Sequence, residues 1–121
     1  MGAAARRVRV ALRVAQGSAA QKAALDDWLA AAPPAPCAVL AEGAFIDLDA
    51  PAAVEVVRLA AGCMCCLGIV PLRVALTRLL RAHRPQSLLL LVATDAHLPR
   101  LRALLDSGDL GPLDLEPVRL P

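Results

Sequence analysis

The stretch Ser87-Leu88-Leu89-Leu90-Leu91-Val92-Ala93 decides the fold of this chain. It is apolar at every position from Leu88 to Ala93, without the alternation of a strand that has one wet face. Continuous apolar strands are typical of parallel sheets, because helical connections cover both faces of such sheets. The stretch therefore predicts the central strand of a parallel sheet.

The segments around this strand predict helices and one further strand. Apolar residues recur at helical spacing from Gly68 to His83, and Arg84-Pro85 ends that helix because proline cannot continue it. A shorter helix is expected over Leu98 to Leu105. Leu113 to Leu120 is then expected as an edge strand, since Pro117 has no N–H group to donate in a sheet interior.

The N-terminal half begins with another strand pattern. From Arg7 to Val14, Val8, Val10, Leu12 and Val14 alternate with a side that carries Arg7, Arg9 and Arg13, as in a half-buried strand. A helix follows, with Ser18 expected to cap it and the proline-rich run from Ala32 to Pro36 stopping it. Its apolar residues are Ala24, Leu25, Trp28 and Leu29, and its polar side is expected to comprise Gln21, Lys22, Asp26 and Asp27. Short strands are expected at Cys37 to Ala41 and Val54 to Leu59.

Strands that alternate with helices predict an α/β fold with a mainly parallel sheet and flanking helices. The length of 121 residues suits one domain. The apolar runs fall far short of the roughly 18 residues of a membrane span, and the basic N-terminus has no apolar secretory segment. A cytoplasmic chain without membrane contact is expected.

Charge is spread along the chain, and the formal net charge is only +2. Nucleic-acid binding needs clustered basic residues with stacking aromatics, and the aromatic residues here are Trp28 and Phe45 alone. Nucleic acid is therefore not an expected partner.

Arg7, Arg9 and Arg13 share one side of the first strand. Burying three unpaired guanidinium groups would cost several kcal/mol for each group. We expect this face to be wet, or to be covered by a protein partner or a second copy that supplies carboxylates.

Cys63-Met64-Cys65-Cys66 is the sharpest chemical signal, because three of the four cysteines lie within four residues. Thiolates in a reducing compartment favour zinc and other soft or borderline metals, and three of them on a tight turn provide most of a tetrahedral shell. The fourth ligand would be Cys37, Glu42, His83, His97 or water. Two alternatives stay open, namely cysteines that only pack as small apolar groups and redox chemistry between Cys63 and Cys66.

The segment from Val57 to Cys66, followed by an amphipathic helix and a buried strand, resembles the Gly-Cys-x-Cys-Cys segment of the CobW family of metallochaperone P-loop GTPases, related to the HypB-like and UreG-like proteins. The family's motif is implicated in metal binding. Val8 to Leu25 resembles its first strand, phosphate loop and helix, Ala38 to Asp47 its Asn-Glu-Phe-Gly-Glu region, and Leu88 to Asp95 its Glu-Thr-Gly strand. Only the cysteine segment is specific. The resemblance implies that residues 1–121 form one partial G domain, equivalent to about the first half of a P-loop GTPase domain.

Departures from the family concern the nucleotide site. A phosphate loop has the pattern G-x-x-x-x-G-K-[ST], in which the lysine meets phosphates and the hydroxyl holds magnesium. Here the segment Gly17 to Ala23 is one residue short, Gln21 replaces the second glycine and Ala23 replaces the hydroxyl residue. Lys22 stands at the lysine position, either as a remnant of a nucleotide site or as a solvated helix residue.

We therefore expect a CobW-like protein that binds metal, with zinc as the expected ion, at Cys63, Cys65 and Cys66, with Glu42 as a fourth ligand. GTP hydrolysis is expected to be lost, with neither GTP nor magnesium as a cofactor, so an enzyme is not expected. Its role would be metal handling or regulation. Two alternatives stay open: residual nucleotide binding at Lys22, and a ligand-free interaction module.

Overall fold

The computed structural model describes residues 7–43, 48–59, 70–96 and 98–116. Helices and strands follow one another in the expected alternation. Their bounds are β1 (Val8–Val14), α1 (Ser18–Ala30), β2 (Cys37–Glu42), β3 (Val54–Leu59), α3 (Val70–His83), β4 (Ser87–Val92), α4 (Leu98–Asp106) and β5 (Leu113–Leu115). The predicted α/β class is confirmed.

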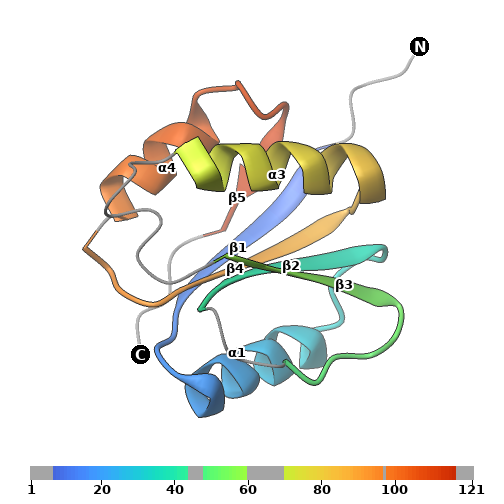
Figure 1. The fold of residues 1–121 in the computed structure, drawn as a ribbon. Coiled ribbons are helices and arrows are strands. Elements are labelled where there is room, and N and C mark those ends of the chain that lie inside the picture. Colours follow the sequence, from blue (N-terminus) through green and yellow to red (C-terminus); the bar gives the residue numbers. More distant parts are fainter. Residues whose placement is uncertain (1–6, 44–47, 60–69, 97, 117–121) are drawn as a thin grey trace.

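The five strands form one sheet in the order β3-β2-β4-β1-β5, and every neighbouring pair is parallel. Helix α1 lies on one face of this sheet, and α3 and α4 lie on the other (Figure 1). Strand β4 is hydrogen-bonded to β2 on one side and to β1 on the other. The prediction that the leucine-rich stretch forms the central strand is confirmed.

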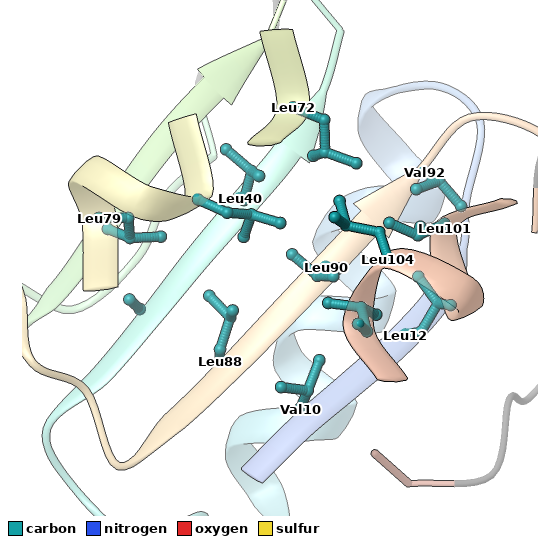
Figure 2. Close-up of a cluster of buried hydrophobic side chains, with 13 residues drawn as sticks. Val10, Leu12, Leu40, Leu72, Leu79, Leu88, Leu90, Val92, Leu101 and Leu104 are labelled. Atoms are coloured by element: carbon teal, nitrogen blue, oxygen red, sulfur yellow. The ribbon is translucent and has the colours of Figure 1, made fainter. Parts of the chain in front are cut away.

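The sheet separates two apolar clusters. Alternate residues of β4 serve both, with Leu88 and Leu90 facing α3 and α4 and with Leu89 and Leu91 facing α1. Figure 2 shows the larger cluster, in which Leu72 and Leu79 of α3 and Leu101 and Leu104 of α4 lie over the sheet. Both faces of β4 are thus dry, which is why its sequence carries no polar alternation.

The start of α1 differs from the expectation. Gly17 occupies the N-cap position with a φ of 90°, and no side chain caps the helix there. Ser18 is the first helical residue. A left-handed φ favours glycine, so the backbone freedom of Gly17 rather than the hydroxyl of Ser18 sets the turn from β1 into α1.

The three arginines on one side of β1 differ in their exposure to solvent. Arg7 and Arg9 are exposed, as expected, but Arg13 is only 8% exposed. The expectation of a wet face is therefore confirmed for the first two residues and wrong for Arg13. Arg13 lies near the carboxyl end of β1, where it pairs in register with the buried Leu91 of β4, whereas β5 pairs only with Val8 to Val10. The buried central strand beside it, rather than β5, accounts for this enclosure.

Membrane insertion finds no support in the helices that the structure describes. None of them is long and apolar enough to cross a bilayer.

Candidate functional site

The carboxyl ends of β1, β2, β3 and β4 lie at one edge of the sheet, because the strands are parallel. From adjacent strands at this edge, β1 continues into α1 on one face and β4 continues into α4 on the other (Figure 1). In open parallel sheets, ligands bind at the place where connections leave toward opposite faces. This edge is the candidate functional site.

Glu42, the last residue of β2, is the buried acidic group of this edge, with 7% of its surface exposed. Its carboxylate Oε1 accepts a hydrogen bond of 2.8 Å from the backbone N–H of Ala93, just beyond β4. Its main-chain oxygen accepts one of 2.8 Å from Nε2 of Gln21 on α1. Glu42 therefore joins three elements at the switch point.

The cysteines of the predicted metal site, Cys63, Cys65 and Cys66, lie outside the described residues. Their position in the chain is still informative, because Leu59 ends β3 and pairs in register with Glu42. The backbone N–H of Gly43 donates to the Leu59 carbonyl at 2.7 Å, which keeps the two strand ends together. Three residues separate Leu59 from Cys63, so the two Cα atoms lie at most about 14 Å apart along the chain. This length is compatible with the predicted sharing of one ion by Cys63 and Glu42.

Two other predicted ligands lie at the opposite edge. Cys37 begins β2, and its Sγ lies 3.6 Å from the Pro34 carbonyl oxygen. Burial raises the pKa of the Cys37 thiol. His83 ends α3, where its Nε2 lies 3.8 Å from Glu55 near the beginning of β3. His97 is outside the described residues.

Within the part of the chain that is described, no three His, Cys, Asp or Glu side chains gather closely enough to hold a metal ion. Glu42 contributes one carboxylate and its neighbours contribute backbone groups. A metal site at this edge therefore depends on ligands from the cysteine segment.

Gln21 corrects the expected polar side of α1, because its side chain is 1% exposed rather than solvated. Its Nε2 donates to the Glu42 carbonyl at 2.8 Å and lies 3.4 Å from the Ala15 carbonyl, while its Oε1 is buried without a hydrogen-bond partner. The spacing of Gln21, Leu25 and Trp28 at i, i+4 and i+7 was the signal for this burial. The Gln21 side chain thus lies against the turn between β1 and α1, where the glycine of a phosphate loop would have no side chain.

Lys22 lies on the outer side of α1, with 42% of its side chain exposed. Its Nζ donates a hydrogen bond of 2.7 Å to Oδ1 of Asp26, one turn further along the helix. That hydrogen bond raises the pKa of Lys22. The Lys22 ammonium group is thus paired with a carboxylate of its own helix.

Replacing Gln21 with alanine is expected to lower the free energy of unfolding by about 2 kcal/mol. The substitution removes the donor from a buried carbonyl, although it also relieves the unpaired Oε1. Urea unfolding followed by circular dichroism measures the loss. The matched control is Gln16→Ala, the same change at an exposed position one residue before the cap, where we expect a loss below about 0.5 kcal/mol. Equal losses in the two variants would contradict a bracing role for Gln21.

In comparisons with known proteins, no protein-family model, curated protein or solved structure matches this chain.

Proposed function

We propose that this chain binds zinc through the thiolates of Cys63, Cys65 and Cys66, with the Glu42 carboxylate as fourth ligand, and that it handles metal without hydrolysing GTP. The observation that carries the proposal is the buried carboxylate of Glu42 beside Leu59, from which the chain continues toward the cysteines. Buried carboxylates are stable when they are paired, hydrogen-bonded or bound to a metal. Three thiolates and one carboxylate complete a tetrahedral zinc shell.

The absence of GTP hydrolysis is supported by the residues that would hold phosphate and magnesium. Gln21 fills part of the turn with its side chain, and Lys22 pairs with Asp26. Ala23 has no hydroxyl to offer a magnesium ion. A shell of three thiolates also suits structural or transferable metal better than catalysis, which needs an open coordination position.

Elemental analysis of protein purified without added metal or chelator tests the proposal. We expect about one zinc ion per chain, and almost none in the double variant Cys65→Ser, Cys66→Ser. The matched control is Cys37→Ser, because that thiol lies at the other end of β2 from Glu42 and should leave the zinc content unchanged.

The variant Glu42→Gln separates ligation from structural support. The amide oxygen of glutamine still accepts the hydrogen bond from Ala93, so the fold should persist. Zinc affinity, measured by competition with a chromophoric chelator, should fall at least tenfold, as expected for a lost anionic ligand. Zinc lost equally in Cys37→Ser, or metal-free protein indifferent to added zinc, would refute the proposal. Saturable protection by GTP against heat would favour the nucleotide-binding alternative.

A further inference from the structure

A second site lies on the opposite face of the sheet from the side chain of Glu42. It is a pocket of about 620 Å³ between the C-terminal end of α1 and the strands β1 and β5. Its volume falls within the roughly 300–1,000 Å³ of small-molecule pockets. The lining combines apolar and charged groups: Trp28, Ala30–Pro34 and Leu115 with Arg9, Arg13, Asp27, Ser87, Asp114 and Glu116.

The burial of the Arg13 guanidinium group without a hydrogen-bond partner on Nη1 points to a ligand. Arg13 is 8% exposed, and its Nη1 is buried with no hydrogen-bond partner in the structure described here. It also lines the pocket. A buried cation without an acceptor destabilises a fold, and an anionic oxygen that enters the pocket would remove that penalty.

The remaining charges suggest the rest of the ligand. Asp114 lies 4.0 Å from the Nε of Arg7 and pairs in register with Arg9, so its charge is offset locally. Asp27 is exposed at the pocket, and Glu116 is partly exposed there. These two carboxylates would accept hydrogen bonds from hydroxyl or amino groups.

The pocket floor limits the size and shape of the occupant. Ser87 is 1% exposed, and its hydroxyl donates to the Pro34 carbonyl at 2.7 Å. Trp28, 3% exposed, provides an apolar wall. A concave pocket with one deep cation and carboxylates nearer the solvent suits a compact molecule.

We propose that this pocket binds a small organic anion, a carboxylate or phosphate that also carries hydroxyl or amino groups, with its anionic oxygen on Arg13. The proposal is independent of the zinc site, since it uses the other face of the sheet. The chemistry that it requires is shared by hydroxy acids and polyol phosphates.

A matched series of three-carbon probes tests it: D-glycerate, glycerol 3-phosphate and uncharged glycerol, each at constant ionic strength. Trp28 is the only tryptophan of the chain and lines the pocket, so its fluorescence reports binding. We expect glycerate or glycerol 3-phosphate to change this fluorescence saturably and to raise the unfolding temperature, and glycerol to do neither. Which anion responds distinguishes the carboxylate from the phosphate.

The variant Arg13→Met keeps the volume of the side chain and removes its charge. We expect it to weaken anion binding at least tenfold while the free protein unfolds at the same or a higher temperature, because the buried charge is gone. Arg100→Met, an exposed residue of α4 across the sheet, is the matched control and should bind like the parent chain.

Three results would overturn the proposal. The first is equal responses to glycerol and to the anions, and the second is unchanged binding in Arg13→Met. The third is a dimer in sedimentation analysis that Arg13→Met dissociates, which would assign the face to a second copy.

Discussion

Replacing Leu90 with alanine is expected to lower the free energy of unfolding by about 3–5 kcal/mol. Leu90 is 1% exposed in the central strand and lies in register between Leu12 of β1 and Leu40 of β2. Figure 2 shows it beneath the helices of that face, with Leu104 of α4 nearby. The loss combines the removed apolar surface with the cavity left among neighbours that are fixed by the sheet. Small domains are stable by only about 5–15 kcal/mol, so this one change removes a large share.

Urea unfolding measures the effect with two signals at once. Circular dichroism reports all helices, and Trp28 fluorescence reports the α1 face, across the sheet from the Leu90 side chain. Coincident transitions would show that the two layers unfold as one unit. Val74→Ala on α3 is the control, because Val74 is 44% exposed and should change stability by less than about 0.5 kcal/mol. A Leu90→Ala loss as small as that of Val74→Ala would contradict the central position of β4.

The sequence predicts those helices and strands whose pattern of apolar residues matches the way they are buried in the fold. The continuous apolar run of β4 reflects two covered faces, and the predicted Val54–Leu59 strand matches β3. The order of the strands in the sheet depends on crossovers between distant segments, which periodicity does not encode. Pairing of β4 between β2 and β1 therefore had to come from the structure.

The residues that sequence reasoning misplaced are polar residues on buried surfaces. Residue type alone predicts solvated positions for Gln21 and Arg13, yet they are 1% and 8% exposed. The hydrogen bond to the Glu42 carbonyl offsets the cost of burying Gln21, whereas the buried Nη1 of Arg13 has no hydrogen-bond partner in the described part of the chain. Glu42 lies 21 residues from Gln21 in the chain, so the local sequence pattern does not reveal this hydrogen bond.

The candidate metal ligands that the structure describes lie at two different edges of the sheet. Residue type alone predicts Cys37 and Glu42 as ligands, but they occupy opposite ends of β2 and cannot serve the same site. That separation could have been predicted from the strand itself, at about 3.3 Å per residue. Zinc binding by Cys63, Cys65 and Cys66 stays a prediction, because these residues lie outside the described part of the chain.

Removing the indole of Trp28 is expected to cost about 3–5 kcal/mol, comparable with Leu90→Ala but on the other side of the sheet. Trp28 is 3% exposed and belongs to the cluster in which Leu25 of α1 meets Val39 and Leu89 of the sheet. Since α1 is the one described helix on this face, it lacks a helical neighbour there to share the loss.

The graded variants Trp28→Phe and Trp28→Ala distinguish lost packing from a detached helix. Phenylalanine retains an apolar ring and should lose about 1–2 kcal/mol, within the range of imperfect core replacements. In Trp28→Ala, a denaturant slope equal to that of the parent chain would mean that α1 still docks around a cavity, and a smaller slope would mean that the native state has already released α1. Release would also break the Gln21 hydrogen bond to Glu42, because Gln21 is held by the same helix. The indole would then support the carboxyl edge from the far end of α1, and zinc affinity should fall together with the slope. A Trp28→Ala variant as stable as the parent chain would exclude this coupling between Trp28 and the Glu42 end of β2.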